Sequence, residues 1–117
     1  MPLKIVLSVG EREFSAELGE GDAAREFYER LPLTMDMSAM AHEKYYYLSE
    51  PLPTAEERVS AISAGDLMLW GNSCFVIFYE SFSTSYSYTR LGKISQTQGL
   101  AEALGGGNVT VSVRAED

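Results

Sequence analysis

Residues 67–80 read LMLWGNSCFVIFYE, and this stretch decides the fold. Two apolar runs, Leu67 to Trp70 and Cys74 to Glu80, flank the short polar turn Gly71-Asn72-Ser73. This arrangement predicts a β-hairpin. The second run is apolar on both faces, which is typical of a strand in the middle of a sheet. We therefore expect this hairpin to lie at the centre of a β-sheet core.

Outside the hairpin, the pattern predicts many short strands and two short helices. Strands are expected where apolar and polar residues alternate, and a helix where apolar residues recur every three or four positions. Asp22 is the expected N-cap of the first helix, Pro32 ends it, and Thr54–Glu57 could begin a further helical turn. The expected strands are Leu3–Val9, Glu13–Leu18, Leu33–Met40, Lys44–Leu48, Tyr88–Ile94 and Asn108–Arg114; the expected helices are Ala23–Arg30 and Gln98–Leu104, and Ser81–Ser87 is expected to be a loop. This order predicts a mainly β protein, a closed or nearly closed barrel capped by two short helices.

Length and composition are those of one globular domain spanning residues 1–117. Hydrophobic residues make up 45% of the chain and charged residues 22%, which are ordinary values for a folded protein. The net charge is -8, from 17 acidic and 9 basic side chains. Phosphate backbones and anionic membrane surfaces repel such a chain, so we expect neither nucleic acid nor a membrane as partner.

Cys74 is the single cysteine, so an internal disulfide is excluded. The N-terminus lacks the features of a signal peptide, and no apolar stretch is long enough to span a membrane, which together predict a cytoplasmic protein. Cys74 is expected to be a small buried hydrophobe; as a nucleophile it would need a base such as the lone His42. His42, Glu43 and Asp36 make a weak metal set without cysteine partners, so neither metal nor cofactor is expected.

Three ordered segments carry a resemblance to a known family. They are Phe14–Leu18 leading into the first helix, Gly65–Leu67 with Asn72–Ile77, and Leu91-Gly92-Lys93-Ile94 followed by the second helix. In this order the chain resembles the cyclophilin fold, and in particular the small bacterial and archaeal branch of cyclophilin-like proteins of unknown function. The resemblance covers nearly the whole chain and implies the closed barrel expected above.

The resemblance does not extend to the residues of prolyl isomerisation. Cyclophilins stabilise the twisted proline amide with an arginine, whereas the corresponding strand here, Lys44–Leu48, contains none. The family's glutamine corresponds to Cys74, its second phenylalanine to Val76 and its histidine to Tyr88. The family's tryptophan falls in the Phe82–Tyr86 loop, which has no tryptophan. Electrostatic stabilisation is usually the largest catalytic contribution, so efficient isomerase activity is not expected, and no catalytic residue is assigned.

A ligand groove is predicted from the tyrosine-rich strands and the positions matching the family. Arg90 would be either a donor at the groove mouth or a surface arginine paired with an acidic residue. Tyr45 and Tyr47 alternate with Tyr46 and must face the other way. Trp70 is expected to anchor the core, Met35, Met37 and Met40 to fill it, and Glu43 and Glu80 to lie at the surface. The predicted groove residues are Tyr45, Tyr47, Cys74, Val76, Phe82, Tyr88 and Arg90.

The leading functional hypothesis is a binding module for a small molecule or short peptide, without efficient prolyl isomerase activity. The alternative is a peptidyl-prolyl isomerase with an atypical site, or another enzyme that uses Arg90, Tyr88 or Glu80. A third hypothesis is an interaction protein whose tyrosines form a homodimer face.

Overall fold

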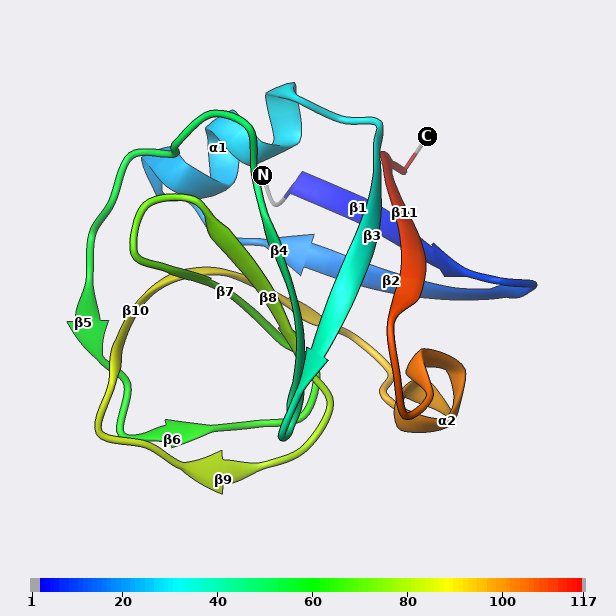
Figure 1. The fold of residues 1–117 in the computed structure, drawn as a ribbon. Helices are drawn as coiled ribbons and strands as arrows, with labels where there is room; N and C mark the ends of the chain where they lie inside the picture. Colours follow the sequence, from blue (N-terminus) through cyan, green and yellow to red (C-terminus); the bar gives the residue numbers. More distant parts are fainter. Residues whose placement is uncertain (1–2, 117) are drawn as a thin grey trace.

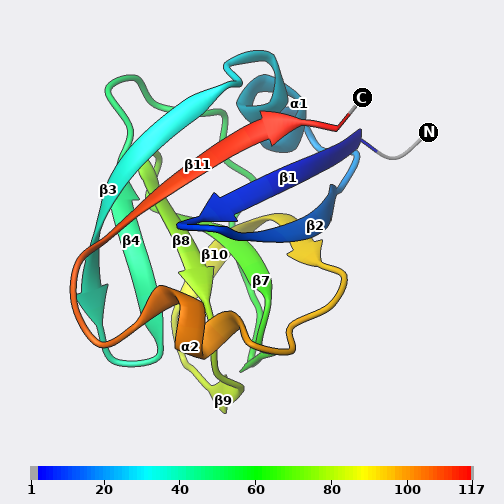
Figure 2. The ribbon, with the colours of Figure 1, turned by 90° about the vertical axis from the view of Figure 1, so that its right-hand side faces the viewer.

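The computed structural model describes residues 3–116 and shows a closed barrel of eight antiparallel strands (Figures 1 and 2). The strand order is β2-β1-β11-β3-β4-β8-β7-β10, and pairing between β10 and β2 closes the ring. The eight strands are β1 (Leu3–Val9), β2 (Arg12–Leu18), β3 (Leu33–Met40), β4 (Glu43–Tyr47), β7 (Asp66–Trp70), β8 (Cys74–Phe78), β10 (Ser87–Ile94) and β11 (Val109–Ala115). The mainly β fold class and the barrel are confirmed.

Two helices cover opposite ends of this barrel (Figures 1 and 2). They are α1 (Asp22–Glu29) and α2 (Leu100–Leu104). Phe27 of α1 stacks on Phe75 of β8 with ring centroids 4.8 Å apart, and Leu100 and Leu104 of α2 are buried in the same core. The two short capping helices that the sequence predicted are therefore present.

The hairpin of β7 and β8 is buried on both of its faces. Leu69 and Phe75 point into the barrel and belong to the main core. Met68 and Val76 point outward and belong to a second buried cluster, which Val59 helps to cover. The central position predicted for β8 is therefore confirmed. Segments outside the barrel complete its outer face, including the two-residue strands β5 (Glu57–Arg58), β6 (Ala61–Ile62) and β9 (Phe82–Ser83).

Gly92 lies where the barrel closes. The register of β10 on β7 shifts between Arg90 and Gly92, and Gly92 is paired with Leu18 of β2. A Cβ atom on Gly92 would lie within 3 Å of the backbone of Glu17 and Leu18. Only glycine lets the two strands approach this closely without moving one of them.

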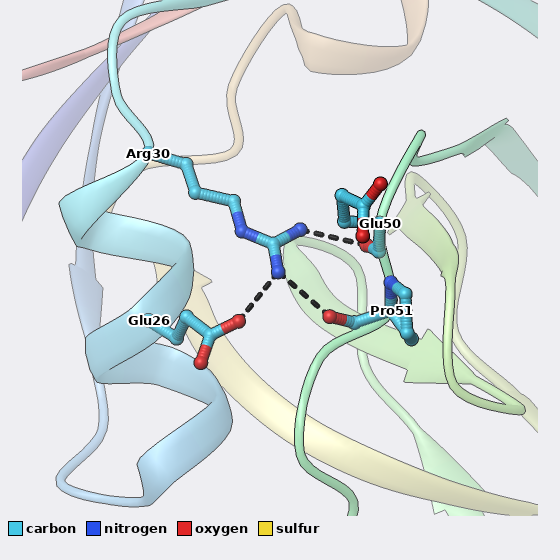
Figure 3. Close-up of polar contacts among 4 residues, drawn as sticks. All are labelled: Glu26, Arg30, Glu50 and Pro51. Atoms are coloured by element: carbon cyan, nitrogen blue, oxygen red, sulfur yellow. Dashed lines mark hydrogen bonds and ion pairs between the residues drawn. The ribbon is translucent and has the colours of Figure 1, made fainter.

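Arg30 ties α1 to the segment that follows β4 (Figure 3). Its guanidinium group donates to the carbonyl oxygen of Glu50 at 2.7 Å and to that of Pro51 at 2.6 Å. It also forms an ion pair with Glu26 one turn earlier in the helix. One side chain thus satisfies two loop carbonyls that no strand partner reaches.

Four local predictions were wrong. Ser81–Ser87, expected to be a loop, contains β9, because Phe82 and Ser83 pair with Ile62 and Ala61 of β6. Gly21, not Asp22, occupies the N-cap position of α1, and no side chain caps the helix there. Thr54–Glu57 forms no helical turn, because Leu52 and Ala55 donate their amides to Asn72 and Thr89 and so hold this segment extended across the barrel. The second helix begins at Leu100 rather than Gln98, since Gly99 adopts a left-handed conformation with φ 81°.

Candidate functional site

The outer face of β4, β8 and β7 carries a row of side chains that forms the floor of a pocket. The strand register places Tyr47 opposite Cys74, and Cys74 opposite Trp70. Residues directly opposite in antiparallel strands share a face, so the three side chains lie side by side. Tyr88 of β10 and Tyr86 before it complete the wall on the far side of β7.

The pocket above this row has a volume of about 280 Å³. We refer to it as the aromatic pocket; it is lined by Met40, Glu43, Tyr45, Tyr47, Trp70, Cys74, Tyr86 and Tyr88. Its lining is predominantly apolar, and Glu43 is the one residue with a carboxyl group among the described residues that line it. Such a concave, aromatic surface with few polar groups is typical of a ligand site.

The exposed apolar side chains of the protein gather at this pocket. Within residues 3–116, the large hydrophobic side chains that remain exposed are Met40 (56%), Tyr47 (58%), Trp70 (47%) and Tyr86 (63%). All four line the aromatic pocket, although they come from β3, β4, β7 and the segment before β10. Single exposed hydrophobics need no explanation, but a contiguous group around a concavity marks a binding surface.

Glu43 lies at the start of β4, opposite Phe78 of β8. Burial raises the pKa of its carboxyl group, and the charge of neighbouring His42 opposes this shift. His42 itself contacts Glu80, with Nδ1 2.9 Å from a carboxylate oxygen, and stacks on Phe82 at a centroid distance of 4.5 Å. The carboxylate of Glu43 is thus only partly compensated within the pocket.

Cys74 and Tyr88 are buried next to this carboxylate. Burial and the charge of Glu43 raise the pKa of the Cys74 thiol to about 11. The same two causes raise the pKa of the Tyr88 hydroxyl. A thiol with such a pKa is protonated at neutral pH, and a protonated thiol is a poor nucleophile. The structure therefore places Cys74 as a buried wall of the pocket rather than an activated group.

Four of the seven predicted groove residues come together at the pocket: Tyr45, Tyr47, Cys74 and Tyr88. Val76 is buried beneath them in the second cluster, and Phe82 packs against that cluster from outside. Arg90 does not line the pocket, because its Nε donates to the carboxylate of Glu57 at 2.7 Å. This ion pair is the alternative that the sequence had left open for Arg90.

Sequence reasoning placed four of the lining residues elsewhere or left them out. Met40 was expected in the core, but it lies exposed at the end of β3, whereas Met35 and Met37 are fully buried as predicted. Trp70 was expected to anchor the core and is instead half exposed at the pocket rim. Glu43 was expected at the surface, and its place in the pocket follows from the register of β4 on β8. Tyr86 lies outside the strands, in the segment before β10, where no alternation shows which way a side chain points.

Metal binding has no support in the described part of the chain. Between residues 3 and 116 no three His, Cys, Asp or Glu side chains are grouped closely enough to hold a metal ion. The helices described there are too short or too polar to cross a membrane.

Comparisons with known proteins agree on the fold. A family model described as "Cyclophilin-like family" matches residues 7–114. The solution structure of a hypothetical protein from Archaeoglobus fulgidus is similar, with a TM-score of 0.65 and 15% sequence identity. The match covers 98% of this chain and 95% of that one. At this identity the likeness concerns the fold alone. A search of curated proteins found no match.

Proposed function

Because this chain belongs to the cyclophilin-like family, we propose that its barrel is a cytoplasmic binding module that holds a small molecule or short peptide in the aromatic pocket. The observation that carries the proposal is the convergence of Met40, Tyr47, Trp70 and Tyr86 on one cavity. Burying apolar surface stabilises by about 25 cal/mol for each Å² removed from water, and these four exposed side chains lack that stabilisation. A ligand that covers them recovers it.

The lining favours binding over prolyl isomerisation. Rotation about a prolyl bond has a barrier of about 18–20 kcal/mol, and lowering it needs a donor aimed at the twisted amide. Within the described chain no arginine, lysine or histidine side chain lines the pocket. Arg90 is occupied by Glu57 outside it. Hydrogen-bond donors among the lining side chains are the tyrosine hydroxyl groups, the indole N–H of Trp70 and the thiol of Cys74. All of them are uncharged, which suits orientation of a ligand more than electrostatic catalysis.

A ligand screen followed by fluorescence tests this proposal. The screen selects compounds and short peptides that raise the melting temperature of the protein. Each is then titrated into the protein while the fluorescence emission of Trp70, the single tryptophan of the chain, is recorded. A change in this emission locates binding at the pocket. We expect at least one ligand whose affinity falls about tenfold in Tyr86→Ser, a truncation of an exposed side chain. A complete screen without a ligand that changes Trp70 emission would contradict the proposal.

The isomerase alternative is separated by a coupled Xaa-Pro isomerisation assay. We expect the rate with protein to stay close to the uncatalysed rate. Substantial activity that is lost in Arg90→Ala would show instead that the chain is an isomerase with an atypical site.

A further inference from the structure

We propose that the aromatic pocket recognises a small organic cation, a substituted ammonium group whose positive charge lies among the aromatic rings and next to Glu43. This inference rests on the proposed binding function and specifies the chemistry of the ligand. Its occupant is a free small molecule.

The rings supply the first part of the recognition. Five aromatic side chains line the pocket: Tyr45, Tyr47, Trp70, Tyr86 and Tyr88. Tyr45 and Tyr47 meet edge to face, with ring centroids 6.0 Å apart and planes at 82°, so they form two adjoining walls rather than a stack. The faces of such rings carry partial negative charge and attract cations, and cages of this kind bind quaternary ammonium groups.

The charge of the pocket supplies the second part. Glu43 brings the single carboxylate of the lining, and no cationic side chain of the described residues accompanies it there. His42 is turned toward Glu80 and Phe82. Lys44 is fully buried on the opposite face of β4, where Nζ donates to the carbonyl oxygen of Gly107. A cation therefore complements the charge of the lining, whereas an anion would be repelled by the carboxylate of Glu43.

The state of Glu43 supports the same ligand. Burial raises the pKa of this carboxyl group, which means that the residues around it compensate its charged form only in part. A bound cation replaces the missing partner and favours the charged form. Cys74 and Tyr88, which also face Glu43, feel its negative charge as a raised pKa and offer no compensation.

The size of the pocket favours a small molecule over a peptide. Its volume of about 280 Å³ lies just below the range of roughly 300–1,000 Å³ that holds drug-sized ligands. This room accommodates a headgroup with a few substituents. An extended peptide would need a longer groove than the one described.

The experiment compares a cation with its neutral isostere. Choline and 3,3-dimethylbutan-1-ol have nearly the same shape, because a quaternary carbon replaces the charged nitrogen. Each is titrated against the emission of Trp70 in the whole chain. We expect choline to bind at least about tenfold more tightly than the alcohol, a difference of about 1.4 kcal/mol.

Two variants and one control test the residues. Glu43→Gln keeps the shape of the side chain and removes its charge. Tyr86→Leu removes an aromatic ring from the exposed rim. We expect each change to weaken choline binding about tenfold. Glu102→Gln removes one charge from the exposed surface of α2 and should leave binding unchanged. Urea unfolding curves check that each variant is folded. If Glu43→Gln does not fold, the binding measurement on Tyr86→Leu still tests the aromatic part of the inference.

Each remaining outcome overturns the inference in a distinguishable way. Equal or tighter binding of the alcohol would show that the pocket binds ligands but does not select a cation, and the proposed function would stand. Tighter binding of a peptide carrying trimethyl-lysine than of choline would refute a free small molecule as the occupant. If no compound of either charge changes Trp70 emission and the wider screen is also empty, the proposed function fails as well.

Discussion

Cys74 illustrates how one position is set by its neighbours. It lies between Tyr47 and Trp70 on adjacent strands and is buried next to Glu43. The sequence predicted a small buried hydrophobe here, and the structure confirms the burial. What the sequence could not supply is the nearby carboxylate, which belongs to a different strand.

At this scale we predict slow alkylation of Cys74. With a pKa of about 11, roughly a thousandth of the thiol is ionised at about pH 8, and only the thiolate reacts. Iodoacetamide should therefore label the folded protein at least about a hundredfold more slowly than the chain unfolded in guanidinium chloride. The rate should rise about tenfold per pH unit until the pH reaches the pKa.

Glu43→Gln gives the matched test of the cause. The negative charge of Glu43 raises the pKa of Cys74, so its removal should lower that pKa and speed labelling of the folded protein. Glu102→Gln should have no effect on the rate. Rapid labelling of the folded wild-type protein near neutral pH would contradict the assignment of Cys74 as a protonated wall residue.

At the scale of elements, α1 is held from both of its sides. Ala23, Ala24 and Phe27 bury its apolar stripe in the main core, as the periodicity predicted. On the other side Arg30 reaches the carbonyl oxygens of Glu50 and Pro51 (Figure 3). Helical periodicity could not reveal these contacts, because the partners of Arg30 lie 20 and 21 residues further along the chain.

We predict that Arg30→Ala destabilises the protein by about 1–2 kcal/mol. The change removes two hydrogen bonds donated by a charged group, each worth about 1.5–3 kcal/mol, but water at this partly exposed site replaces part of this stabilisation. Urea unfolding measures the difference. Arg25→Ala on the exposed face of the same helix is the control and should change stability by less than about 0.5 kcal/mol.

Arg30→Lys separates the bridging contacts from the charge. A lysine is a point donor on a flexible stem and cannot reproduce the forked contact with both carbonyls. Its stability should therefore fall close to that of Arg30→Ala. Stability equal to that of the wild type in either variant would show that the bridge in Figure 3 contributes little.

At the scale of the whole molecule, one hairpin serves two apolar clusters. The inner faces of β7 and β8 fill the barrel, and their outer faces form the base of the second cluster beneath the pocket. Phe82 of β9 helps to cover this second cluster, tilted against Phe78 at a centroid distance of 5.6 Å. Because the barrel core does not include Phe82, the cover can loosen without unfolding the barrel.

We therefore predict a local effect of Phe82→Ala. Amide hydrogen exchange should accelerate in β6 and β9, whose pairing Phe82 supports, while β1, β2 and β11 keep their protection. Local opening of this kind requires that a region has few contacts with the main core. Equal acceleration in all strands would show that the two clusters unfold as one unit.

The sequence by itself determined the class of fold and most of its elements. Alternation and turn residues identified the eight barrel strands to within one or two residues, because local periodicity follows directly from which face is buried. It also placed Tyr45, Tyr47, Cys74 and Tyr88 together as candidates. What it could not fix were the short strands β5, β6 and β9, each only two residues long, since so short a segment carries no period.

Only the tertiary structure decided the composition of the pocket. Trp70 and Met40 have the same apolar character as core residues, and whether such a side chain ends in the core or at a rim depends on what lies opposite it in the register. Glu43 and Arg90 likewise took their roles from partners on other strands: Glu43 from the aromatic rings around it, and Arg90 from Glu57. Periodicity along one strand carries no information about the strand across from it, so these placements required the closed barrel.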